Sequence, residues 1–217
     1  SQFIAAAEET GQIRYLTEFA IQQALEDSIK LEHEGFAMRI GVNISSRLLT
    51  DLAFVEHSLR LLDGANDRVT FEITETTVVD DWNIALENLK MFSAAGVRLA
   101  IDDYGSGLSS LAYVQQLPIQ ELKIDRSFIT QLTNTHRDPL LVRSTIELGH
   151  ALDLEVVGEG VEDAETFALL TVMGCDLAQG YFVGRPMPLP ELVAYLRADT
   201  AQELVTRPFS FNFIGGR

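Results

Sequence analysis

Side chains that can bind cations or phosphate end six apolar, β-branched runs along this chain. They are Asn43, Glu72, the pair Asp102 and Asp103, Lys123, Glu159 and Gln179. A helix-sized segment separates each run from the next. Parallel barrels place their catalytic residues at the carboxyl ends of successive strands in this way, so the pattern predicts an active site.

The acidic members of this set predict a site for hard divalent cations. Glu72, Asp102 and Asp103 supply charged oxygens, and Asn43 supplies a neutral amide oxygen. These donors suit Mg²⁺ or Mn²⁺ better than Zn²⁺, which prefers His and Cys. Adjacent strand residues face opposite ways, so both aspartates reach one site only if the chain turns there, as Gly105 would allow.

Each of these residues also has a purely structural interpretation. The aspartate pair could begin a polar turn, and Glu72 could lie in solvent beyond its strand. Asn43 could form an Asx turn or cap the helix that follows it. Their shared position at strand ends favours an active site over three separate explanations.

Lys123 lies inside an apolar run, between Leu122 and Ile124, where an unpaired ammonium would cost several kcal/mol of desolvation. It therefore needs an anionic partner. Strand alternation puts Glu121 and Asp125 on the same face as the lysine, so a salt bridge to either is one interpretation. The other is that Lys123 points into the active site, where it would orient a water molecule or contact a phosphate oxygen.

Alternating strand and helix patterns predict one α/β domain with parallel strands joined by right-handed crossovers. Strands are expected over residues 36–44, 69–73, 97–101, 122–124, 155–158 and 175–183. Helices are expected over residues 12–33, 46–52, 54–62, 108–116, 140–152, 164–173 and 190–196, with one more from about residue 82 to the glycine at position 96. These strands are two short of the number that closes a standard barrel. Residues 209–214 alternate like a strand and are expected to form an added edge strand.

The 217-residue chain has a formal net charge of −16, which excludes a basic surface for long nucleic acids. Cations held by the carboxylates would still let an acidic site bind a small phosphorylated ligand. Cys175 is the only cysteine, so no intrachain disulfide forms and a reducing compartment is expected. With no membrane-spanning run and no signal segment, the domain is expected to be cytoplasmic without membrane contact, although its parent protein could be membrane-anchored.

Six motifs, in this order and spacing, resemble those of the EAL-domain cyclic di-GMP phosphodiesterases of bacteria. They are Asn43-Ile-Ser, Glu72-Ile-Thr-Glu75, Asp102-Asp-Tyr-Gly-Ser-Gly, Lys123-Ile-Asp125, Glu159-Gly-Val-Glu162 and Gln179-Gly-Tyr. The resemblance runs from Phe3 to about Pro188 and implies a modified TIM-type (β/α)₈ barrel. It also implies hydrolysis of one phosphodiester bond of cyclic di-GMP, which gives the linear dinucleotide pGpG.

The resemblance implies a role for each matched residue. A two-metal centre of Mg²⁺ or Mn²⁺ would be held by Asn43, Glu72, Asp102, Asp103 and Glu159. Lys123, Glu159 and Gln179 would be the catalytic residues, with Lys123 and Gln179 serving the attacking water. Glu75 and Glu162 would brace the loop that follows the aspartate pair.

The chain departs from the family pattern in two respects. Tyr104, Ser106 and Leu108 stand where members usually have Phe, Thr and Tyr, and Gly158 stands where they have Ala. The Glu-Ala-Leu segment that names the family, with a metal-binding Glu and the first two strands, is expected upstream of residue 1. Residues 1–217 are therefore expected to form a single EAL-type domain that is incomplete at its N-terminus, with weak or no catalysis by the isolated chain.

The resemblance further implies cyclic di-GMP as the ligand and additional sensory or GGDEF-type domains in the parent protein. The unpaired edges of an incomplete barrel predict a homodimer. Two other functions stay open. A receptor of this fold would bind cyclic di-GMP without hydrolysis or regulate a partner, whereas a domain that naturally lacks the first strands would act through dimerisation or protein contacts.

Overall fold

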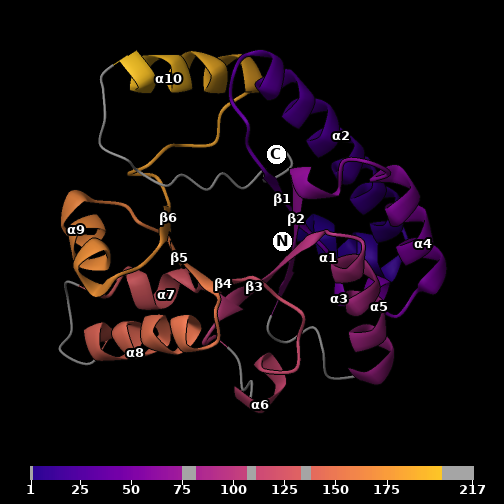
Figure 1. Cartoon of the computed structure of the whole chain (residues 1–217), viewed down its shortest axis with the longest axis horizontal. Coiled ribbons are helices and arrows are strands. Elements are labelled where there is room, and N and C mark those ends of the chain that lie inside the picture. The colour runs from indigo at the N-terminus through magenta and orange to yellow at the C-terminus, as the bar shows by residue number, and fades with distance from the viewer. Residues whose placement is uncertain (1, 75–81, 107–110, 133–137, 202–217) are drawn as a thin grey trace.

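A computed structural model describes residues 2–74, 82–106, 111–132 and 138–201, in which helices alternate with strands (Figure 1). The strands are β1 (Ile40–Asn43), β2 (Val69–Thr74), β3 (Arg98–Tyr104), β4 (Glu121–Ile124), β5 (Glu155–Glu159) and β6 (Leu177–Gln179). The helices are α1 (Gln2–Glu9), α2 (Ile13–His33), α3 (Ser46–Leu49), α4 (Leu52–Leu61), α5 (Trp82–Ala94), α6 (Leu111–Val114), α7 (Arg126–Ile129), α8 (Asp138–Ala151), α9 (Ala164–Met173) and α10 (Leu189–Ala201), with a 3₁₀ turn at Asn66–Arg68.

The six strands form one sheet in chain order, and every pair of neighbours is parallel. The sheet curls, and the connecting helices surround its outer side (Figure 1). Among the described residues, β1 and β6 are the two edges of the sheet. The architecture is therefore an incomplete TIM-type barrel, which confirms the predicted fold class.

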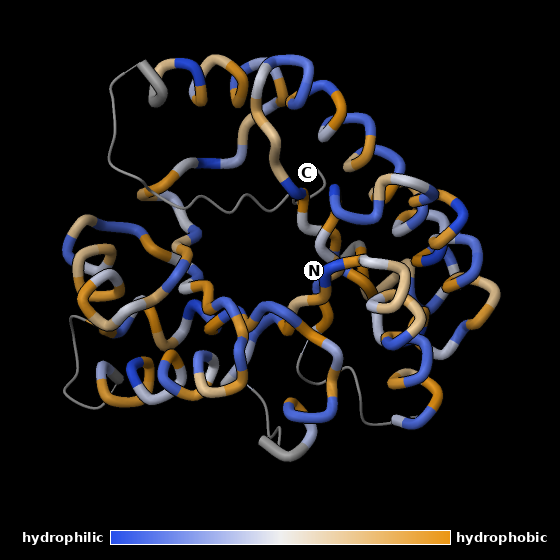
Figure 2. Tube along the Cα trace, in the orientation of Figure 1, coloured by the Kyte–Doolittle hydropathy of each residue, from blue (hydrophilic) through white to orange (hydrophobic). Residues whose placement is uncertain are grey.

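The hydrophobic core lies between the outer face of the sheet and the helices. Phe71, Leu99, Leu122 and Val156 supply one fully buried side chain from each of the four central strands. Phe71 also meets Phe92 of α5 edge to face, with 5.0 Å between ring centroids. Hydrophobic and hydrophilic residues alternate along the surrounding helices, as expected for helices that bury one side (Figure 2). The strand residues between these core positions face the barrel interior, because side chains alternate along a strand.

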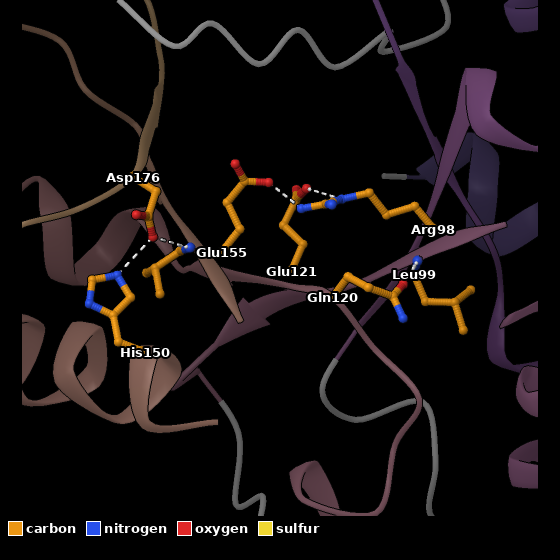
Figure 3. Close-up of polar contacts among 8 residues, drawn as sticks. Arg98, Leu99, Gln120, Glu121, His150, Glu155 and Asp176 are labelled. Atoms are coloured by element: carbon orange, nitrogen blue, oxygen red, sulfur yellow. Dashed lines mark hydrogen bonds and ion pairs between the residues drawn. The ribbon is translucent and has the colours of Figure 1, made fainter. Parts of the chain in front are cut away.

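Polar residues occupy that interior at the amino ends of the strands. Arg98 of β3 reaches Glu121 of β4, with 3.3 Å between Nε and Oε2, and Glu155 of β5 (Figure 3). We call these three residues the amino-end cluster. Asp176, just before β6, accepts a hydrogen bond of 2.8 Å from the backbone N–H of Val156.

The observed strands at both edges are shorter than the predicted ones. Residues 36–39 do not pair, because the backbone N–H of Phe36 bonds the carbonyl of Leu31 at 2.9 Å and so completes the end of α2. At the other edge, β6 ends at Gln179 rather than near residue 183. Helix α1, which the sequence analysis did not predict, precedes α2. The predicted edge strand over 209–214 lies outside the described residues.

Within the described part of the chain, no helix combines the length and the apolar character that crossing a membrane requires.

Candidate metal centre at the carboxyl ends of the strands

One buried ammonium lies among the carboxylates at the carboxyl ends of the strands. Lys123 Nζ is 2.7 Å from Glu159 Oε1 and 3.0 Å from Asp102 Oδ1. Its third contact, with Glu72 Oε2, is 3.2 Å long. The Lys123 side chain is fully buried and that of Glu72 is 2% exposed, so this contact is shielded from water. Strand β4 thus places its lysine between residues from β2, β3 and β5.

The lysine does not pair with the two acidic residues on its own strand face. Glu121 is held by Arg98 at the other end of the barrel. Asp125 instead accepts a 2.9 Å hydrogen bond from the backbone N–H of Ser127 and caps the first turn of α7. The predicted salt bridge from Lys123 to Glu121 or Asp125 is therefore wrong, and the lysine points into the candidate active site.

The aspartate pair reaches one site because the chain turns at Asp103 itself. Its φ of +55° lies in the left-handed region, which aspartate tolerates better than most residues. The pairing of β3 with β4 also shifts register between Ile101 and Tyr104. The backbone N–H and the hydroxyl of Ser106 both donate to the Asp103 carbonyl, at 3.1 and 2.8 Å. Gly105 also has a positive φ, of +100°, so the chain turns there as expected, and the turn begins two residues earlier at Asp103.

This turn brings three predicted ligands together. Oxygens of Asp102, Asp103 and Glu159 lie within 4.8 Å of one another, close enough to hold one cation. We call these three residues, together with Glu72 and Lys123, the carboxyl-end cluster. It contains four carboxylates and one ammonium, so its formal charge favours additional cations.

The surroundings of the cluster shift the pKa values of its members. Burial raises the pKa of Glu72 to about 8 and that of Glu159 to about 7, although Lys123 opposes both shifts. Burial, with the nearby carboxylates of Asp102 and Asp125, raises the pKa of Asp103 to about 6. Burial also disfavours the Lys123 ammonium, but its three carboxylate partners outweigh this and raise its pKa above the usual value. The lysine therefore stays charged.

Several polar atoms of this region lack hydrogen bonds among the described residues. They are Glu72 Oε2, Asp102 Oδ1, Gln179 Oε1 and Lys123 Nζ, whose three contacts have ion-pair distances without hydrogen-bond geometry. In native proteins nearly all buried polar atoms form hydrogen bonds. A group of buried oxygens without hydrogen bonds at the carboxyl ends of the strands therefore indicates a further ligand. Carboxylate and amide oxygens are the donors that Mg²⁺ and Mn²⁺ prefer, so the residues fit such an ion.

Gln179 and Asn43 occupy the flanks of the cluster. Gln179 pairs in register with Glu159, and Asn43 pairs in register with Glu72. Asn43 is exposed, and the N-cap of α3 is Ser45, so the alternative in which Asn43 caps that helix is wrong. After Gln179, the backbone of Gly180 packs so closely on Val161 that a Cβ would lie 2.2 Å from the Val161 carbonyl oxygen. Only glycine allows this approach, which holds Gln179 beside the Glu159 loop.

The two loop-bracing residues stay predictions. Glu75 lies outside the described residues, and Glu162 is exposed just after Glu159. Asp125, in contrast, enters the site although it was considered only as a partner of the lysine. Its carboxyl group is close enough to that of Asp103 to contribute to the raised Asp103 pKa. The two-residue spacing from Lys123 already put Asp125 on the same face of the strand, but it did not indicate a contact with Asp103.

Comparison with known proteins agrees with the motifs. The model of the EAL domain matches residues 1–186. The chain is 37% identical over 202 residues to the bifunctional diguanylate cyclase/cyclic di-GMP phosphodiesterase MucR of Pseudomonas aeruginosa, covering 89% of this chain and 29% of MucR. It is 33% identical over 192 residues to the cyclic di-GMP phosphodiesterase PdeR of Escherichia coli, covering 86% of this chain and 29% of PdeR. The chain thus spans less than a third of either relative.

Solved structures show the same fold. The MucR phosphodiesterase in complex with cyclic di-GMP superposes with a TM-score of 0.81 at 36% identity, over 88% of this chain and 79% of that one. The EAL domain of Mycobacterium smegmatis DcpA gives a TM-score of 0.79 at 31% identity, over 84% of each chain.

Proposed function

Because the chain belongs to the EAL-domain family, we propose that its carboxyl-end cluster hydrolyses one phosphodiester bond of cyclic di-GMP and releases linear pGpG. One water molecule is consumed: its oxygen bonds to phosphorus while the bond from phosphorus to a ribose 3′ oxygen breaks. The leaving oxygen takes up a proton and becomes a hydroxyl group. The observation that carries the proposal is the convergence of Asp102, Asp103 and Glu159 within 4.8 Å, beside buried oxygens that have no hydrogen bond.

We assign two Mg²⁺ or Mn²⁺ ions to this cluster. Their ligands are Asn43, Glu72, Asp102, Asp103 and Glu159. When bound, such ions activate water for attack and neutralise the charge of the phosphate. The carboxylates bind the ions in their deprotonated form, so the raised pKa values of Glu72 and Glu159 make metal affinity increase with pH.

Lys123 and Gln179 act on the water and the phosphate. The Lys123 ammonium stays charged and is fully shielded from bulk water, so it stabilises negative charge that develops beside it. The buried Oε1 of Gln179 lacks a hydrogen bond and can accept one from the attacking water. Glu75 and Glu162 are assigned to bracing the loop that follows Asp103.

Two glutamates on the same strand allow a matched test of this proposal, in which the turnover of cyclic di-GMP by a variant of each is compared. Glu159 ends β5 in the carboxyl-end cluster, whereas Glu155 begins β5 in the amino-end cluster. With Mg²⁺ or Mn²⁺ present, chromatography should detect pGpG from the wild type and from Glu155→Gln. Glu159→Gln should lose activity by about 10³-fold, because several kcal/mol of transition-state stabilisation disappear.

The assay is run on the full-length parent protein as well as on this chain, since the chain spans less than a third of the curated relatives MucR and PdeR. If the parent forms no pGpG and its Glu159→Gln variant behaves identically, the proposed hydrolysis is wrong. Tight binding of cyclic di-GMP without turnover would favour the receptor function instead. The carboxylates that the cluster retains support hydrolysis over that alternative.

We also propose a setting for the domain. The name of MucR includes a diguanylate cyclase activity, and this chain spans 29% of that protein. By analogy, sensory or GGDEF-type domains accompany the domain, which works in the cytoplasm and forms a homodimer. Light scattering of the purified protein tests the dimer directly, because a monomeric mass at micromolar concentration would exclude it.

A further inference from the structure

Among the described residues, the barrel interior holds Lys123, whose side chain is fully buried, and Arg98, whose side chain is 19% exposed, and the surroundings of these two cations differ. Arg98 donates hydrogen bonds from Nε and Nη2 to Glu121 and Glu155. Lys123 instead approaches three carboxylates, none of them in hydrogen-bond geometry. A guanidinium fixes two carboxylates in a rigid fork, whereas an ammonium on a flexible stem behaves as a movable point charge. Of the two cations, Lys123 is therefore the one whose carboxylate partners can also bind another cation.

We propose that Lys123 is an internal counter-ion that competes with divalent metal for the carboxylates of Glu72, Asp102 and Glu159. The inference rests on the metal site assigned under the proposed function. It gives the lysine a second role, which is to hold the carboxylates together when metal is scarce. Metal and ammonium are then alternative sources of positive charge for the same oxygens.

The atoms at the contact support this competition. Glu72 Oε2 and Asp102 Oδ1 lie 3.2 and 3.0 Å from Lys123 Nζ, and neither has a hydrogen bond to another described group. A metal ion that binds either oxygen must therefore share it with the ammonium. Two cations that use the same oxygens repel one another, so each weakens binding of the other by the same factor.

The lysine also explains how the strand ends stay folded without metal. Four carboxylates at the ends of β2, β3 and β5 would otherwise face one another in a partly buried site. Removing a buried counter-ion leaves such carboxylates uncompensated and is strongly destabilising. The cost should fall when a metal ion supplies the missing charge.

Thermal unfolding and calorimetric Mn²⁺ titration of three proteins test the inference: wild type, Lys123→Met and Arg98→Met. In EDTA, each variant should unfold about 10 °C below wild type, because each loses a cation that pairs with carboxylates inside the barrel. Mn²⁺ should recover most of that loss in Lys123→Met and none of it in Arg98→Met. Lys123→Met should also bind Mn²⁺ about tenfold more tightly than wild type, with Arg98→Met unchanged.

Equal or weaker Mn²⁺ binding by Lys123→Met would overturn the inference, since the lysine would then support the metal site rather than compete for it. If Lys123→Met is unfolded in EDTA and stays unfolded in Mn²⁺, the comparison moves to Glu72→Gln with and without Lys123→Met. Tighter Mn²⁺ binding by the double variant supports competition, and equal or weaker binding refutes it.

The same titration separates this inference from the proposed function. Absence of Mn²⁺ binding by the wild type would refute the metal site itself. Binding by the wild type that Lys123→Met does not strengthen would refute only the competition.

Discussion

The two ends of the barrel interior are built from the same kinds of residue but differ in how fully their polar atoms are satisfied. In the amino-end cluster, Arg98 donates hydrogen bonds to both of its glutamates (Figure 3). In the carboxyl-end cluster, about 13 Å further along the strands, Lys123, Glu72 Oε2 and Asp102 Oδ1 have no hydrogen bonds among the described residues. The polar atoms of the first arrangement are satisfied, whereas the second keeps buried oxygens without a hydrogen-bond partner among the described residues.

Raised carboxyl pKa values do not distinguish the two ends. Burial raises the pKa of Glu121 in the amino-end cluster, just as it raises those of Glu72 and Glu159 in the other. Burial therefore raises carboxyl pKa values at both ends of the barrel, whatever the role of the residue. Hydrogen-bond satisfaction is therefore the better sign of function here, because it differs between ends where burial does not.

The largest expected difference in turnover comes from substituting one aspartate at each end of the barrel, in two separate variants. Asp102→Asn removes a charged ligand from the carboxyl-end cluster and should lower cyclic di-GMP turnover by about 10³-fold, measured as pGpG formation. Asp176→Ala changes an aspartate near the amino ends and should retain turnover. A comparable loss of turnover in both variants, with both folded by circular dichroism, would contradict the division between a catalytic and a structural end.

The pH dependence of stability should reveal the excess carboxylates. The pKa values of Glu72, Glu159 and Asp103 are raised in the folded protein to about 8, 7 and 6. A carboxyl group whose pKa is raised by folding stabilises the protein at low pH and loses this contribution as the pH rises through its folded pKa. In EDTA, the free energy of unfolding should therefore fall by a few kcal/mol, to order of magnitude, between about pH 5 and pH 8.

Urea denaturation at several pH values measures this slope. Saturating Mn²⁺ is the control, because metal binds the deprotonated carboxylates and should flatten the dependence. Stability in EDTA that rises over the same pH range would contradict the raised pKa values.

Asp176→Ala should have a smaller effect, and on stability alone. The side chain accepts hydrogen bonds of 2.8 Å from the Val156 N–H and lies 2.8 Å from His150 Nε2 (Figure 3). Truncation leaves the backbone N–H at the start of β5 without this partner, which costs about 1–3 kcal/mol. Urea denaturation measures the loss, and His150→Ala isolates the contribution of the imidazole.

The order of elements was predictable because it depends on local patterns. Apolar runs such as Val69–Ile73 of β2 are separated by helical periodicity and ended by Gly and Pro, and all six predicted strands occur. The residue at which β1 begins and the residue at which β6 ends were not predictable. They depend on the Phe36 amide bonding back to Leu31 and on Gly180 packing against Val161, and these contacts form only in the folded chain.

The residues of the site were predictable from their position at strand ends, but their contacts and backbone conformation were not. Alternation put Lys123 on one face with Glu121 and Asp125, yet its partners lie on β2, β3 and β5, and only the folded sheet shows which residues they are. The positive φ of Asp103 likewise lies within the register shift between β3 and β4. The sequence shows that an aspartate tolerates this conformation, but not that it adopts it.

The smallest expected effect concerns the outer face of β5, next to the catalytic end. A Cβ at Gly158 would lie 2.8 Å from Leu170 Cδ1 and 3.5 Å from the Cys175 sulfur. Gly158→Ala should therefore destabilise the fold by about 1 kcal/mol through overpacking. Because Leu170 is a side chain that can be shortened, Gly158→Ala with Leu170→Val should recover part of the loss.

A double-mutant cycle of Gly158→Ala and Leu170→Val by urea denaturation measures this coupling. The contact predicts a favourable interaction energy of about 0.5 kcal/mol or more between the two substitutions. Since the Gly158 Cβ would point away from the interior, turnover should change far less than with Glu159→Gln. A large loss of turnover with normal stability would show instead that the catalytic end depends on packing outside the barrel, and the contrast between the two ends would no longer explain function.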